Sequence, residues 1–359
     1  MEQFLGVIMS IIVFGSMSFA RNPRTYFSND FYVKTVLSDS SIQSPLTAGE
    51  PKEAISCRER IKSILCIVEP IKPETAEITR ECGAGSEDYA HYFEALYDAY
   101  PPVLQKMFCS LKVINIEKQF FGTAYAGLVK DKNGKILGAE MGIRKSVLDE
   151  NLSLEVWATW KDQLSFGGST DSYASTPGLP AVKTSTPFNG VSDFLYFVVA
   201  HEFGHMLDFS NHLNRMTNCS DETWREINPP ECQMHEDGWG GISWLTDRKP
   251  KAENEFVNRV DLCFYSCEGK TIDPLSATQI YTDLHNSNFI SLYSSIQPWD
   301  DFADSLAYFM MNRHLFSPYL IEVSKGRQFD IMTKLRSPIW SKKYDYLDRL
   351  VNRTDLIYP

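Results

Sequence analysis

The sequence predicts an α+β fold, with a small sheet in the first half of the chain and helices after it. Residues 111–143 are rich in β-branched and apolar side chains and contain a strong turn sequence, which is typical of strands joined in a hairpin. From residue 194 onward, apolar side chains recur at helical spacing. The 359 residues are 43% hydrophobic, which is enough for a packed core in one large or two modest domains.

The first segment, residues 1–20, is predicted to be a signal peptide. Residues 5–19 are mostly apolar, and Ser18-Phe19-Ala20 places small residues where a signal peptidase cleaves, before Arg21. An uncleaved N-terminal anchor is the alternative, because this segment begins with Glu2 and has no basic residue. No later segment is long and apolar enough to be expected to span a bilayer.

Two segments precede the expected sheet. Residues 21–53 are polar and aperiodic, and we expect an N-terminal extension with one short strand near residues 31–37. Residues 54–110 are expected to form a helical lead-in, because the apolar spacing is helical and Pro101-Pro102 ends one such run. The expected helices of this lead-in are 57–68, 87–99 and 102–108.

The expected sheet and the elements beside it follow. Residues 111–117 and 124–129 are predicted strands, and Asp131-Lys132-Asn133-Gly134-Lys135 is a turn that joins residues 125–129 to 136–143 in a hairpin. A helix is predicted over 148–164 from its apolar spacing. A Gly-, Ser-, Thr- and Pro-rich loop follows at 167–190, serving either as a cleft rim or as a plain connector.

The eight cysteines all lie beyond the predicted signal peptide, and their even number indicates an exported, oxidised protein that is periplasmic or secreted. Short spacing suggests Cys57–Cys66, Cys219–Cys232 and Cys263–Cys267, which leaves Cys82–Cys109, although sequence alone leaves the connectivity open. The net charge of −11 without a basic run predicts no binding to nucleic acid or to an anionic membrane. The sequence does not predict the oligomeric state.

The motif His201-Glu202-Phe203-Gly204-His205 follows the apolar run 194–200 and is expected on a buried helix capped by Ser192 or Asp193. Residues four apart share a helix face, so the two imidazoles can bind one metal ion while Glu202 lies beside an open coordination position. Gly204 is expected to leave room beside the metal. These are the requirements of a zinc hydrolase.

A catalytic zinc ion needs a third protein ligand. The histidine-rich extension HExxHxxGxxH is not followed, since Asp208 and Asn211 occupy its last two defined positions. A long insertion, residues 211–287, separates the motif from a second predicted helix that begins near Pro298. The first turns of that helix contain Asp300 and Asp301.

The stretch Asp300-Asp301-Phe302-Ala303-Asp304 resembles the EGFAE and EFFAE patterns of the gluzincins, a group of HExxH zinc metallopeptidases that includes the lethal factor-like family. In that register the resemblance implies Asp300 as the third zinc ligand, with Asp304 orienting a ligating histidine. Tyr293, seven residues before Asp300, matches the tyrosine that stabilises the oxyanion in the lethal factor-like domain. Asp301 is an alternative ligand, and His235 in the insertion is a substitute without motif support.

The resemblance implies a zincin-like metallopeptidase domain over residues 111–359, with a small sheet, an active-site helix and a C-terminal helical part. We therefore expect an exported zinc metallopeptidase that binds one Zn²⁺ per chain and hydrolyses protein or peptide substrates, with Glu202 as the general base. Three alternatives stay open. They are an inactive binding protein on the same scaffold, a hydrolase of cell-wall peptides, and a disulfide-stabilised surface protein in which HEFGH is a coincidence.

Overall fold

The computed structural model of the chain describes residues 56–68, 82–120, 122–130, 135–170, 172–184, 192–219, 231–265, 267, 271–315, 318–323 and 326–359. It has the predicted mixture of helices and strands. The predicted signal peptide (1–20), the extension (21–53) with its strand, and turn residues 131–134 lie outside the described residues. Within the described part of the chain, no helix combines the length and the apolar character that crossing a membrane requires.

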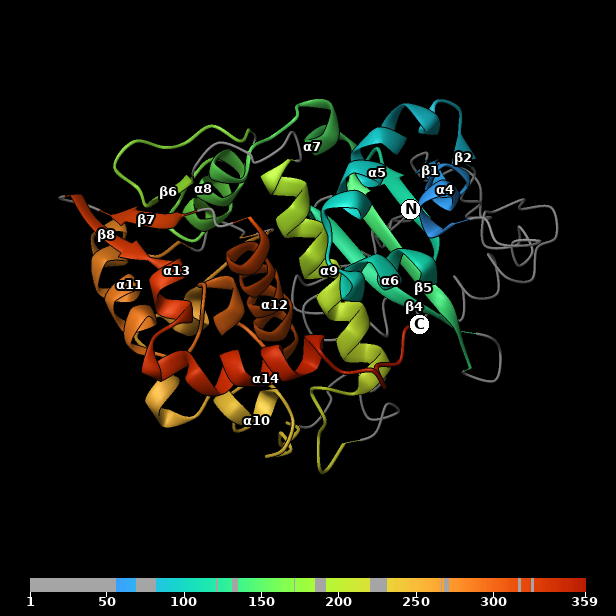
Figure 1. Ribbon diagram of the computed structural model, residues 1–359. Helices are drawn as coiled ribbons and strands as arrows, with labels where there is room; N and C mark the ends of the chain where they lie inside the picture. The colour runs from blue at the N-terminus through green and yellow to red at the C-terminus, as the bar shows by residue number, and fades with distance from the viewer. Residues whose placement is uncertain are drawn as a thin grey trace, which may run out of the picture.

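A five-stranded sheet forms one side of the molecule (Figure 1). Its strand order is β2-β1-β3-β5-β4. Strands β1, β3 and β5 are mutually parallel, whereas β2 and β4 run antiparallel to their neighbours at the two edges. The bounds are β1 (Leu65–Val68), β2 (Cys82–Gly83), β3 (Leu111–Glu117), β4 (Ala124–Lys130) and β5 (Ile136–Arg144). The predicted strands and the antiparallel pairing of the hairpin are therefore confirmed.

The segment predicted as a helix over 57–68 is helical only in its first part. It forms α4 (Cys57–Arg60), the 3-10 turn η1 (Ile61–Ile64) and then strand β1. The apolar run Leu65-Cys66-Ile67-Val68 is buried throughout and pairs in parallel with β3. Tertiary pairing has overridden the local helical spacing, as it often does for a short apolar run.

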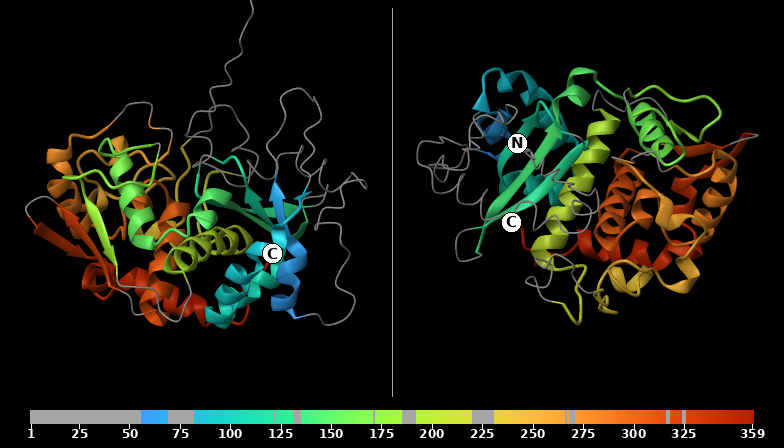
Figure 2. Two further views of the ribbon diagram at one scale, coloured as in Figure 1. Left: turned by 90° about the horizontal axis from the view of Figure 1, so that it is seen from above. Right: turned by 180° about the vertical axis from the view of Figure 1, so that it is seen from behind.

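Helices α5 (Ala90–Ala99) and α6 (Pro102–Ser110) confirm the two other helices of the lead-in. They pack with α9 (Asp193–Asn211) beside the sheet (Figures 1 and 2). Phe108 of α6 meets Phe203 of α9 edge-on, with ring centroids 5.0 Å apart. Tyr100 meets Tyr196 in the same way at 4.7 Å and donates a hydrogen bond to its carbonyl oxygen. These aromatic contacts fix helix α9 against the first half of the chain.

The helix predicted over 148–164 is divided into α7 (Lys145–Asp149) and α8 (Leu154–Leu164). Asn151 has a positive φ of 46°, which a helix cannot include, and the Ser153 hydroxyl accepts a hydrogen bond from the Val156 amide to begin α8. The loop after α8 contains a strand, β6 (Ala181–Thr184), which sequence analysis missed together with β7 (Tyr319–Val323) and β8 (Arg327–Asp330). These three form a second antiparallel sheet in the order β6-β7-β8.

Helix α9 runs through the middle of the molecule, with the five-stranded sheet on one side and the later helices on the other (Figure 1). Its neighbour on that second side is α12 (Pro298–His314), the helix predicted to begin near Pro298. The two helices meet at Gly204, where an added Cβ would lie 2.8 Å from the Cα of Ala303. Gly204 therefore permits close packing of the two helices, and its expected role of leaving room beside the metal stays a prediction.

The remaining elements surround α12. The described parts of the insertion contain one short helix, α10 (Gly240–Ser243), then three 3-10 turns and, at its end, helix α11 (Ala277–Asn286). The expected C-terminal helical part contains α13 (Ile331–Leu335) and α14 (Ser341–Val351). The 3-10 turns are η4 (Ala252–Asn254), η5 (Arg259–Asp261), η6 (Pro274–Ser276), η7 (Tyr293–Ser295) and η9 (Pro338–Trp340).

All eight cysteines form disulfides, and two of the four suggested pairs are confirmed, Cys219–Cys232 and Cys263–Cys267. The other two pairs were wrong, because Cys57 bonds Cys109 and Cys66 bonds Cys82. Short spacing misled because Cys66 lies on a strand beside β2, which contains Cys82, while α4 and α6 pack together and bring Cys57 to Cys109.

Candidate metal centre

Helix α9 presents both motif histidines on one face. Ser192 is its N-cap and accepts a hydrogen bond from the Leu195 amide at 3.3 Å, while Asp193 accepts hydrogen bonds from the amides of Phe194 and Leu154. From residue 193 to residue 210 the helix is buried on all sides, which explains the unbroken apolar run before the motif. His201 and His205 are therefore polar groups placed inside a core.

The two imidazoles converge with one carboxylate. The Nε2 atoms of His201 and His205 lie 3.1 Å apart. The Oδ1 atom of Asp300, from the first turn of α12, lies 3.4 Å from the His205 Nε2 atom and 3.8 Å from the His201 Nε2 atom. Among the described residues, His201, His205 and Asp300 form a group whose ligand atoms lie close enough together to hold a metal ion.

These separations fit a zinc ion. Tetrahedral ligand atoms about 2.1 Å from zinc lie roughly 3.4 Å from one another, which is close to all three observed separations. The other carboxylate oxygen of Asp300 accepts a hydrogen bond from Gln297 Nε2 at 2.6 Å, so that Oδ1 is the oxygen turned to the histidines. The donor set of two imidazoles and one carboxylate is also one that zinc uses in hydrolases.

The ring of His201 is oriented from behind by Asp304. Its Nδ1 atom lies 2.7 Å from Asp304 Oδ1, and the Ser291 hydroxyl donates to the other oxygen of the same carboxylate. Burial would raise the pKa of Asp304, but the Lys161 ammonium and His201 outweigh burial and hold the pKa below its ordinary value. An ionised carboxylate on Nδ1 leaves the Nε2 lone pair of His201 directed toward the site.

His205 is oriented differently. Its ring stacks on Phe209 with centroids 5.7 Å apart, and its buried Nδ1 atom has no hydrogen-bond partner among the described residues. Burial lowers the pKa of His205, but the adjacent Asp300 carboxylate outweighs this and raises the pKa above its ordinary value. Both observations tie His205 to Asp300 through its Nε2 atom.

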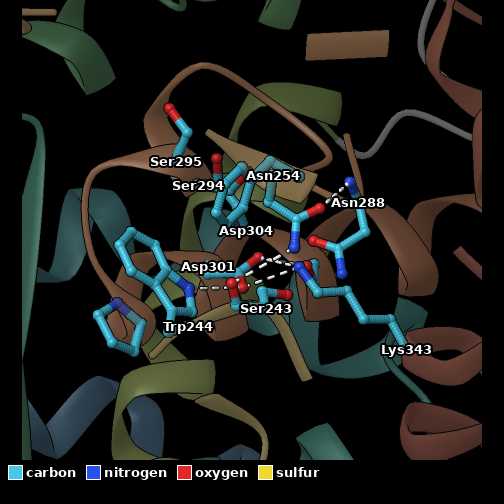
Figure 3. A network of polar contacts seen from close by, with 12 residues as sticks. Ser243, Trp244, Asn254, Asn288, Ser294, Ser295, Asp301, Asp304 and Lys343 are labelled. Carbon is cyan, nitrogen blue, oxygen red and sulfur yellow. Dashed lines mark hydrogen bonds and ion pairs between the residues drawn. The ribbon is translucent and has the colours of Figure 1, made fainter. Parts of the chain in front are cut away.

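Asp301, the alternative ligand, is turned away from the histidines. Both of its carboxylate oxygens accept hydrogen bonds from Lys343 Nζ, at 2.6 and 2.8 Å, and Oδ2 also accepts one from Trp244 Nε1 at 3.1 Å (Figure 3). His235 is not part of the cluster either. Of the candidates for a third ligand, the structure brings Asp300 to the histidines.

Asp208 and Asn211 replace the last two defined residues of the histidine-rich extension. Both side chains form hydrogen bonds to other segments of the chain. Asp208 accepts hydrogen bonds from the Asn214 amide at 2.8 Å and from its side chain at 2.7 Å. The Asn214 side chain also donates to the carbonyl oxygen of Pro298 at 3.2 Å. These hydrogen bonds attach the end of α9 to the beginning of α12, close to Asp300.

Glu202 and Tyr293 both lie near the cluster. Glu202, which lies between the two histidines in the sequence, is buried. Burial raises the pKa of its carboxyl, although both histidines act in the opposite direction. The Tyr293 ring lies 5.9 Å from the His201 ring, and burial raises the pKa of its hydroxyl well above the ordinary value. A hydroxyl with a raised pKa remains a hydrogen-bond donor at neutral pH.

Sequence analysis missed several residues that shape this site. Gln297 donates a hydrogen bond to Asp300, and Ser291 donates one to Asp304. No sequence motif marks Gln297 or Ser291. Lys161 of α8 lies with its Nζ atom 4.4 Å from the centre of the Tyr293 ring. Tyr265 belongs to the insertion, and Glu202 contributes to the raised pKa of its hydroxyl, although burial is the main cause. Gln297, Ser291 and Lys161 share burial of a polar side chain, which becomes visible only in three dimensions.

No family model, curated protein or solved structure matches this chain. Its function therefore has to be inferred from the residues and the geometry of the site.

Proposed function

We propose that this chain is an exported zinc metallopeptidase of the gluzincin type, with a zincin-like fold over residues 111–359. One observation carries the proposal. His201, His205 and Asp300 bring three donor atoms within 4.8 Å of one another inside a buried region, and Glu202 of the HExxH motif lies between the histidines in sequence. The four disulfides and the predicted signal peptide support export to an oxidising compartment.

His201, His205 and Asp300 would hold one zinc ion, with Asp304 orienting His201. A zinc ion held there would supply a Lewis acid, which could polarise a scissile carbonyl and lower the pKa of water. Glu202 takes the proton of the attacking water and passes it to the leaving amine. The Tyr293 hydroxyl donates a hydrogen bond to the oxyanion that develops on the carbonyl oxygen. The reaction is hydrolysis of an amide bond.

The sheet supports a peptide as the substrate. Strand β4 is an edge strand that pairs with β5 and packs against α9, the helix with the histidines. No other described strand covers its outer edge. An extended peptide can add to such an edge through main-chain hydrogen bonds, which would place the peptide backbone beside α9.

Glu202→Gln is the direct test of this function. The amide has nearly the shape of the carboxylate but cannot accept the proton of water, so we expect cleavage of a peptide library to fall by at least about 100-fold. Zinc content should remain at one ion per chain, because Glu202 is not a ligand. Glu236→Gln, at an exposed glutamate of the insertion, is the matched control and should keep full activity. A Glu202→Gln variant that cleaves like the wild type would refute the assignment.

A further inference from the structure

Two adjacent carboxylates begin α12 and have opposite surroundings. Asp300 faces the histidines, while Asp301 is fully buried and bonded on both oxygens to Lys343 of α14, which is fully buried as well. Trp244, at the end of α10 in the insertion, donates to Asp301 from another side (Figure 3). Three segments that are distant in sequence therefore meet at the residue next to a metal ligand.

We infer that Lys343 and Trp244 are positioning residues for the metal ligand Asp300, acting through Asp301. This inference rests on the proposed function. Side chains of consecutive helical residues are separated by a fixed rotation of about 100° around the helix axis. Holding Asp301 between Lys343 and Trp244 therefore sets the rotation of the first turn of α12, and with it the direction in which Asp300 points.

The energetics of the pair also favour a role in geometry. A buried ion pair gives little net stability, because desolvation of the two charges offsets their attraction. Lys343 is enclosed further by aromatic rings, with its Nζ atom 5.2 Å from the centre of the Trp239 ring and 5.1 Å from that of Phe289. An apolar pair would pack as well in such surroundings. A charged pair adds direction, since its hydrogen bonds are satisfied in one arrangement only.

The pair has a second consequence for the metal site. Asp301 is the residue next to Asp300, and its carboxylate on the same helical turn could compete for a metal ion. Lys343 neutralises Asp301 and occupies both of its oxygens. Asp300 is thereby left as the carboxylate that faces both histidine Nε2 atoms, and Gln297 binds its outer oxygen. We expect the ligand geometry to loosen when Lys343 is removed.

The test compares Lys343→Met with the double variant Asp301→Asn/Lys343→Met, using zinc affinity and the visible absorption spectrum of the Co²⁺-substituted protein. Lys343→Met leaves a buried charge without a partner and can fail to fold, whereas the double variant removes both charges. Changes to residues that orient metal ligands weaken metal binding about 10- to 100-fold. We expect a loss of that size in the double variant, with a changed Co²⁺ spectrum because the ligand geometry differs.

The matched control is Asp348→Ala. Asp348 of α14 forms a partly exposed ion pair with Arg313 of α12, so it joins the same two helices far from the first turn. This variant should bind zinc and Co²⁺ like the wild type. A folded double variant with wild-type zinc affinity and an unchanged Co²⁺ spectrum would overturn the inference and leave the proposed function standing. A wild-type protein that binds no zinc would overturn both.

Discussion

The two sides of helix α9 are stabilised in different ways. On the sheet side, the core is apolar and aromatic, and among the described residues its buried charged side chains are the carboxylates of Glu117 and Glu140. On the side of α12, the described core buries charges of both signs, and several of them are paired or hydrogen-bonded. The buried charged residues on and around α12 include Lys161, Asp162, Arg259, Asp300, Asp301, Asp304, Lys334 and Lys343.

This difference separates stability from geometry. Apolar packing and the disulfides Cys57–Cys109 and Cys66–Cys82 stabilise the sheet side. Neither kind of contact orients a polar side chain toward a ligand. Buried ion pairs contribute little net stability but fix directions. Around α12 they lie next to the residues that are proposed to bind zinc. We therefore expect changes on the sheet side to alter unfolding at every pH. Changes near α12 should alter the site or make unfolding depend on pH.

The largest effect on stability should come from the disulfide that closes the longest loop on the sheet side. Cys57–Cys109 spans 52 residues, and replacing both cysteines by serine should lower the free energy of unfolding by about 4 kcal/mol. Cys263–Cys267 in the insertion spans 4 residues, and its removal should cost about 2 kcal/mol. Urea unfolding of both variants checks the order. Equal losses, or a larger loss for the short loop, would contradict the comparison.

A smaller effect, dependent on pH, should come from Asp162 on the α12 side. Burial raises its pKa from 3.8 to about 6, while Lys161 and the hydrogen bond from Tyr281 act in the opposite direction, and Asp304 raises it slightly further. A carboxyl whose pKa is raised by folding stabilises the protein below pH 4, and this contribution is lost as pH rises to about 6. The shift of about two units corresponds to about 3 kcal/mol.

Asp162→Asn cannot ionise, so its stability relative to the wild type should rise by up to about 3 kcal/mol between pH 4 and pH 6 and then stay constant. Urea unfolding at four pH values measures this difference. Tyr281→Phe is a second control. Loss of the 2.8 Å hydrogen bond from Tyr281 to Asp162 should move the pH range over which stability changes to higher pH. Parallel stability curves for wild type and Asp162→Asn would show that the buried charge is fully compensated.

Sequence analysis predicted those parts of the fold that depend on local patterns. The hairpin strands follow from segments rich in β-branched and apolar residues around a turn, and α9 and α12 follow from apolar spacing with the cap at Ser192 and with Pro298. It failed where tertiary pairing decides the structure. The run Leu65–Val68 became a strand because β3 lies beside it, and the pairing of Cys66 with Cys82 depends on that strand.

The same division applies to the site. His201, His205, Asp300 and Asp304 could be predicted because a motif and a register mark them, and the structure brings all four together. Lys343 could not be predicted, since it lies 42 residues from Asp301 in sequence and no pattern joins them. Residues that orient a site from distant elements have no local signature. The catalytic roles of Glu202 and Tyr293 stay predictions until activity is measured.

The most direct test of the central claim is the zinc content of the purified mature protein, measured by elemental analysis for wild type, Asp300→Ala and His235→Ala. We predict one zinc ion per chain in the wild type and in His235→Ala, and loss or strong weakening of binding in Asp300→Ala, with unchanged circular dichroism in all three. A wild-type protein without zinc, or an Asp300→Ala variant that retains it at wild-type affinity, would contradict the account.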